Sequence, residues 1–154
     1  VLHLSQLKEG ARCLLVTGAH ALEFWDYAQS APPEEFMSTA FEGIDCAVSA
    51  ENQLIVIADR RGLIHLLSQN DYSQVSVLES DSDLVTDLCF VPSSRLLAAA
   101  YRSGAIRLWD TRQFKVIKEY RNDQSPVTAI QSSADARNVI AAALNGNVSI
   151  WKLP

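Results

Sequence analysis

The feature that most constrains this chain is a repeat of constant period, which aligns the whole sequence without an insertion. Trp25, Leu67, Trp109 and Trp151 occupy equivalent positions and are equally spaced. We call the number of residues between consecutive equivalent positions the repeat interval. An apolar residue stands three residues before each of these positions and another stands one residue before it, and the residue between them is polar in every copy. This alternation is typical of a β-strand with one buried face. The repeat therefore predicts an array of similar β units.

Two further apolar segments precede the tryptophan-bearing segment in every unit, and another follows it in three units. The first segments read VLHLSQ, GIDCAV, VTDLCF and VTAIQS, the second CLLVT, IVIAD, LAAAY and VIAAA, and the last EEFMST, QVSVLE and KVIKEY. Gly62, Gly104 and Gly146 stand five residues before the repeated position, where we expect turn glycines with positive φ. We therefore predict an all-β fold with four short antiparallel strands per unit.

The pairs Trp25-Asp26 and Trp109-Asp110, with the four strands and a period within the range of about 40–45 residues, resemble a WD-repeat β-propeller. The other two copies have Leu67-Ser68 and Trp151-Lys152. The resemblance covers the whole chain. It implies one propeller domain over residues 1–154, with blades 1–42, 43–84, 85–126 and 127–154, the last of which lacks its outer strand. About four blades form a partial ring, which we expect to be the C-terminal part of a seven-bladed propeller.

The copies also depart from the family pattern. The usual Gly-His pair and the turn aspartate ahead of the glycine are missing, so the family's buried Asp-His-Ser-Trp network cannot be assembled in any unit. Each indole N–H is therefore expected to find another partner or water. The chain begins at Val1, so we expect a piece of a longer protein. An open arc exposes an apolar face and a strand edge, and we expect the remaining blades or a second chain to complete the ring.

Charge and composition exclude several classes of function. The chain has 13 basic and 18 acidic residues, a net charge of −5, which disfavours binding to nucleic acid or to anionic membranes. No apolar run is long enough to span a membrane. The three cysteines, Cys13, Cys46 and Cys89, lack zinc-site spacing and a disulfide pattern. We therefore predict a cytoplasmic or nuclear protein.

Motifs for catalysis are missing from the sequence. The histidines lie in different units, and neither a phosphate-binding glycine loop nor a serine nucleophile motif occurs. Asp45 and Asp87 occupy equivalent first-strand positions, where some propeller enzymes hold a metal. The other two units have His3 and Ala129 there, so structural aspartates are the favoured interpretation. We predict no enzyme activity, no metal and no cofactor.

The resemblance places the turns between second and third strands at the same end as the turns between blades. We call this end of the propeller the rim, and basic and acidic side chains from neighbouring blades would lie together there. The candidate partner-binding residues are Arg60, Arg61, Arg102, Tyr101, Asp81, Asp83, Asn122 and Asp123. Tyr101 would either anchor a partner or pack between blades. Ordinary turn chemistry is the alternative for each charged residue.

We predict a non-catalytic scaffold of a multiprotein complex that binds proteins or peptides through these rim loops. A substrate receptor of a ubiquitin ligase or a similar modifying complex is one alternative. A propeller hydrolase with an axial metal is another.

Overall fold

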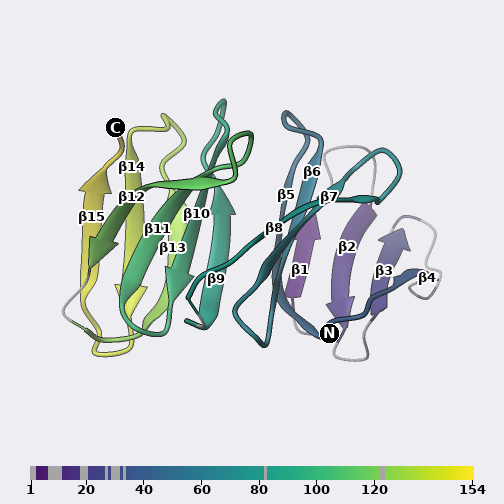
Figure 1. Ribbon diagram of the computed structural model, residues 1–154, viewed down its shortest axis with the longest axis horizontal. Helices are drawn as coiled ribbons and strands as arrows, with labels where there is room; N and C mark the ends of the chain where they lie inside the picture. Colours follow the sequence, from purple (N-terminus) through teal and green to yellow (C-terminus); the bar gives the residue numbers. More distant parts are fainter. Residues whose placement is uncertain are drawn as a thin grey trace. The chain divides into compact units, whose positions relative to one another are not determined.

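The computed structural model describes residues 3–6, 12–17, 21–26, 28, 32, 34–81, 83–121 and 124–154 (Figure 1). These residues form antiparallel strands and no helix. The strands are β1 (His3–Gln6), β2 (Arg12–Thr17), β3 (Ala21–Asp26), β4 (Glu34–Ser38), β5 (Gly43–Ser49), β6 (Leu54–Asp59), β7 (Ile64–Ser68), β8 (Gln74–Leu78), β9 (Val85–Phe90), β10 (Leu96–Tyr101), β11 (Ala105–Asp110), β12 (Lys115–Arg121), β13 (Val127–Ser132), β14 (Asn138–Ala143) and β15 (Val148–Lys152).

Neighbours in the sequence pair in the sheets, as expected for a chain that meanders. The sheets are β1-β2-β3-β4, β5-β6-β7-β8, β9-β10-β11-β12 and the three-stranded β13-β14-β15. The predicted all-β architecture of four-stranded antiparallel sheets is confirmed. No described helix is long and apolar enough to cross a membrane.

The chain divides into two compact units. The first comprises residues 1–60 and 64–77, and the second residues 61–63 and 78–154. In the first unit, β5 lies against β1 and β2. Its core contains Leu22 and Phe41 together with Cys46, Ile55, Ile57 and Leu67. Burial raises the pKa of the Cys46 thiol, which therefore stays protonated and packs as a small apolar group.

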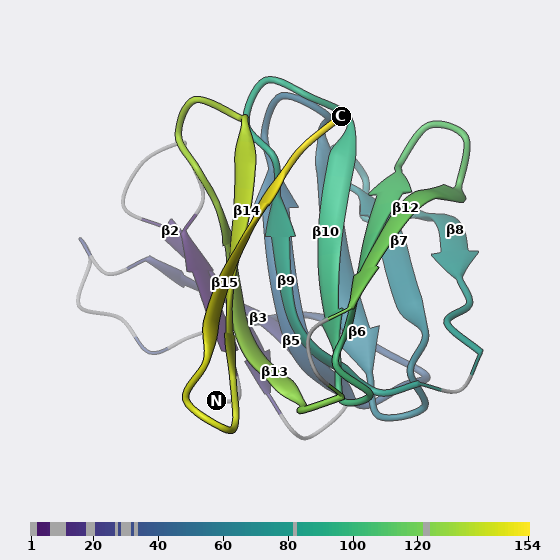
Figure 2. The same cartoon turned by 90° about the vertical axis from the view of Figure 1, so that its left-hand side faces the viewer.

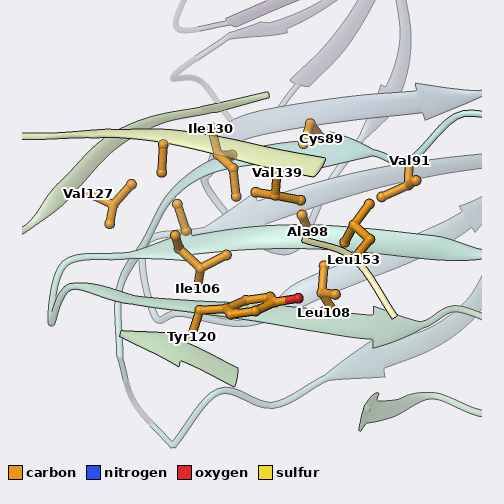
Figure 3. Packing of buried hydrophobic residues seen from close by; sticks show 12 residues of the cluster. Cys89, Val91, Ala98, Ile106, Leu108, Tyr120, Val127, Ile130, Val139 and Leu153 are labelled. Carbon is orange, nitrogen blue, oxygen red and sulfur yellow. The ribbon is translucent and has the colours of Figure 1, made fainter. Parts of the chain in front are cut away.

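In the second unit, the first strand of the last sheet lies against the preceding sheet, since β13 contacts β9 and β10. Figure 3 shows Ile106, Leu108 and the ring of Tyr120 on one side of this core. Ile130 and Val139 lie on the other side. The alanines of β10 are fully buried. Small side chains at these positions allow the two sheets to approach closely, which the sequence predicted.

Hydrogen bonds also join the β9–β12 sheet to the β13–β15 sheet and fix the position of β13 along β9. The backbone N–H of Ile130 donates to Oδ2 of Asp87 at 2.7 Å. The hydroxyl of Ser132 donates to the carbonyl oxygen of Phe90 at 3.0 Å. Asp87 is thus a structural carboxylate that joins β9 to β13.

The three turn glycines adopt the backbone conformation that the sequence predicted. Their φ angles are +84° at Gly62, +89° at Gly104 and +86° at Gly146. This left-handed region is unfavourable for residues with a Cβ atom. Each glycine therefore allows the tight turn that leads into the third strand of its sheet.

Candidate functional site

One loop and one turn of the second unit are held together by a buried serine. The hydroxyl of Ser80, in the β8–β9 loop, lies 2.5 Å from the carbonyl oxygen of Gly62 and 2.9 Å from that of Asp83. The N–H of Asp83 donates back to the carbonyl of Ser80 at 3.0 Å. Ser80 is almost fully buried. These bonds fix the β8–β9 loop against the turn that contains Gly62.

The same loop is also bonded to the turn between β10 and β11. Oδ1 of Asp83 accepts the backbone N–H of Ser103 at 3.3 Å, and Oδ2 accepts its hydroxyl at 2.5 Å. The N–H of Arg102 donates to the carbonyl of Leu84 at 2.9 Å. A carboxylate bound to N–H and O–H groups in this way makes strong, charge-assisted hydrogen bonds. The backbone of both loops is therefore held in one arrangement.

Charged side chains project from this bonded framework. Arg61 and Arg102 are exposed, and the side chain of Asp81 is 90% exposed, with Oδ2 3.6 Å from Nη2 of Arg107. We call Arg61, Asp81, Asp83 and Arg102 the rim cluster. All four belong to the second unit, and the hydrogen bonds above connect their loops, as the sequence predicted for turns at one end of a propeller.

Another predicted rim residue, Arg60, does not belong to this cluster. Arg60 lies in the first unit, where its Nε is 2.7 Å from Oε1 of Glu42 and its N–H donates to the carbonyl of Glu42. Asn122 and Asp123 lie outside the described residues. They stay predictions from the sequence.

Tyr101 is not at the surface, so the interpretation of this residue as an exposed anchor for a partner needs correction. Its side chain is fully buried, and its hydroxyl accepts a hydrogen bond from the indole Nε1–H of Trp109 at 3.2 Å. Cζ of Arg107 lies 5.0 Å from the ring centroid. Burial raises the pKa of Tyr101 to about 12. Tyr101 supplies the substitute partner for the indole N–H, and it packs inside the protein.

A second charged group of the structure was missed in the sequence. Nε of Arg107, on β11, is 2.9 Å from Oε2 of Glu119 on β12, and Nη2 of Arg121 is 2.8 Å from Oε1 of the same carboxylate. The hydrogen bond from Arg107 lowers the pKa of Glu119. The register of the predicted third and fourth strands could have revealed this group, because their antiparallel pairing places Arg107 opposite Glu119.

The described residues contain no group of three or more histidine, cysteine, aspartate or glutamate side chains that could hold a metal. Asp45 is buried, and Asp87 is used between strands, as described above.

Comparison with known proteins identifies the family. Residues 38–152 match the family model of the WDR11 first beta-propeller. The crystal structure of the computationally designed Ika4 protein has the same fold, with a TM-score of 0.78 over 99% of this chain and 91% of that chain, at 19% identity. No curated protein matches the sequence. WD-repeat propellers are in general non-catalytic and serve as scaffolds for protein interactions. The family match covers most of the chain, which therefore belongs to the WDR11 first-propeller family of WD-repeat β-propellers.

Proposed function

We propose that the chain is a non-catalytic scaffold within an intracellular multiprotein complex, and that it binds a partner protein or peptide through the rim cluster. The observation that supports this is that the backbone of the β8–β9 and β10–β11 loops is held by hydrogen bonds, whereas charged side chains next to it are exposed. Hydrogen bonds through Ser80 and Asp83 hold the backbone. The side chains of Arg61 and Arg102 stay exposed.

A rigid loop that presents charged side chains is suited to protein recognition. Binding then requires little ordering of the backbone, and less conformational entropy is lost on association. Arginine is enriched at protein interfaces. Opposite charges close together orient the partner and raise the rate of association. A partner segment with an acidic side chain for Arg102 and a basic one for Asp81 would match this pattern.

The test reverses the charge of the rim without touching its buried bonds. The double variant Arg61→Glu/Arg102→Glu should keep the unfolding temperature of the wild type but capture fewer partner proteins in an affinity pull-down read by quantitative mass spectrometry. Arg95→Glu is the matched control, because Arg95 is exposed in the turn at the opposite end of the β9–β12 sheet. Unchanged capture by the double variant would refute the rim proposal, and stoichiometric calcium or zinc in the purified chain would contradict a purely non-catalytic role.

We further propose that another four-stranded sheet of the same polypeptide covers the outer face of β13-β14-β15. Figure 2 shows this three-stranded sheet, with β15 as its last strand. Val148 and Ile150 are each 66% exposed on this face. Their equivalents one repeat interval earlier, Ile106 and Leu108, are fully buried against the following sheet. The repeat thus assigns to Val148 and Ile150 the positions that the next sheet normally covers.

Maleimide labelling of an Ile150→Cys variant tests this second proposal. The cysteine should react rapidly in the 154-residue chain and slowly in the protein extended by its flanking coding sequence. Equal rapid labelling in both forms would refute it. A dimer of the shorter chain with slow labelling would assign the face to a second copy instead and would equally overturn the proposal.

A further inference from the structure

The outer strand of the β9–β12 sheet has an open edge. Among the described strands, β12 pairs only with β11, and it is drawn in green at the edge of its sheet in Figure 1. Every residue of β12 except Tyr120 is exposed. An edge strand presents unpaired N–H and C=O groups along one side and can pair with a strand of another chain.

Basic residues recur at every third position along this strand and the turn before it. Arg112, Lys115, Lys118 and Arg121 are all exposed. The equivalent residues of the second copy are Asn70, Ser73, Ser76 and Glu79, and those of the first copy are Ala28, Ala31, Glu34 and Met37. The equivalent outer strand thus forms in the first and second copies without a basic residue at these positions. The four positive charges are therefore a property of this one sheet that its fold does not require.

Large apolar side chains lie among these charges. Phe114, Val116 and Ile117 are between 39% and 46% exposed. Ile117 stands where the register between β11 and β12 shifts, because Lys118 is opposite Leu108 and Val116 is opposite Trp109. A bulge of this kind redirects the side chains of an edge strand. The strand therefore offers apolar surface that is not covered by its own sheet.

The one acidic residue of β12 is already neutralised within the protein. The carboxylate of Glu119 binds Arg107 and Arg121 on its two oxygens. The charged side-chain groups of Lys115 and Arg112 form no ion pair with an acidic residue among the described residues, although the backbone N–H of Arg112 donates to Oδ1 of Asp110 at 2.8 Å. Nζ of Lys118 lies 4.9 Å from the centroid of the Tyr120 ring. The exposed edge is therefore positive, on a chain whose net charge is −5.

We propose that β12 is a docking edge for an extended segment of a partner protein in which acidic and apolar residues alternate. Backbone pairing along the open edge would supply affinity, and side-chain contacts would supply specificity. Acidic residues would meet Lys115 and Lys118, and apolar residues would contact Val116 and Ile117. Lysine on an edge also disfavours pairing with a second copy of the same strand, since like charges placed opposite each other repel. The same charges thus select an acidic strand over β12 itself.

Fluorescence anisotropy of the full chain with a short dye-labelled peptide of alternating glutamate and valine tests this proposal. The peptide should bind, and its counterpart with lysine in place of glutamate should not. Lys115→Glu/Lys118→Glu should weaken binding by about tenfold or more, since it exchanges attraction for repulsion. Ser73→Glu/Ser76→Glu, at the equivalent positions of the second copy, is the matched control and should leave the affinity unchanged.

Strand pairing is separated from simple charge attraction by a third peptide. N-methylation of alternate residues along one edge of the glutamate peptide removes backbone donors without changing its charge, and it should abolish binding. Undiminished binding of this peptide, equal binding of the lysine peptide, or equal weakening by both double variants would each overturn the proposal. The rim variant Arg61→Glu/Arg102→Glu should bind the peptide normally, so the outcome does not depend on the rim proposal.

Discussion

A methyl group added at Gly62 should destabilise the second unit far more than one added at Gly146. Both glycines lie in the second unit, in equivalent turns, with φ of +84° and +86°. They differ in their surroundings. A Cβ atom at Gly62 would overlap the backbone carbonyl of Asp83 and approach Oγ of Ser80 within 3.2 Å, whereas nothing lies within 4 Å of a Cβ atom at Gly146.

The magnitude follows from two separate terms. The left-handed conformation should cost about 1–2 kcal/mol in either alanine variant. At Gly62 the carbonyl of Asp83 cannot withdraw freely, because the β8–β9 loop is bonded through Ser80 and Ser103. Overpacking of this kind costs about 1–3 kcal/mol. We therefore expect Gly146→Ala to lose about 1–2 kcal/mol of unfolding free energy and Gly62→Ala about 2–5 kcal/mol. The first cost is common to both variants, so the two losses should differ by about 1–3 kcal/mol.

Urea unfolding followed by tryptophan fluorescence measures both variants. Trp109 and Trp151 report on the second unit, and a Trp25→Phe background removes the signal of the first. Linear extrapolation gives the free energies of unfolding, and unchanged m values show that the denatured state is unaffected. Losses that agree within about 0.5 kcal/mol would mean that the Asp83 carbonyl exerts no steric effect, which would refute the reasoning.

Three further predictions concern the core of the second unit. Trp109→Ala should cost about 3–5 kcal/mol in urea unfolding because the indole is buried, and a loss below about 1 kcal/mol would contradict its place in the core. Tyr101 binds its proton more tightly when folded, so its contribution to stability should be constant below pH 10 and should be lost as the pH rises toward 12. A Tyr101→Phe variant should lack this part of the alkaline loss, and identical pH profiles would count against the raised pKa. Asp87→Ala should cost about 1–3 kcal/mol because the N–H of Ile130 loses its acceptor, whereas Asp87→Asn should cost less, since its amide oxygen still accepts.

The periodic features of this protein could be predicted from the sequence, and its side-chain pairings could not. The constant repeat interval determines where strands begin and where a positive φ is needed, because both depend on local pattern and on glycine. The partner of the Trp109 indole depends on which side chain reaches it across the paired strands β10 and β11. Tyr101 ends an apolar segment and directly precedes Arg102 in the sequence, a position compatible both with an exposed anchor and with packing between blades, so the sequence alone did not decide that its ring is buried.

The repeats of this chain differ in their side-chain pairs while the sheets keep one architecture. Asp59 and His65 in the first unit are equivalent to Tyr101 and Arg107 in the second, since one repeat interval separates the members of each equivalent pair. In the first unit Nε2 of His65 lies 3.2 Å from Oδ2 of Asp59, and its ring stacks on Phe41.

In the second unit the equivalent contact joins a guanidinium group to an aromatic face. The two pairs differ in charge and shape, yet each joins the end of the second strand to the third strand of its sheet. The repeat fixes which backbone positions face each other, and any two side chains that satisfy one another there maintain the sheet. Substitutions that exchange one such pair for the other as a unit should therefore be tolerated better than either single exchange, because a single exchange leaves a buried polar group without its partner.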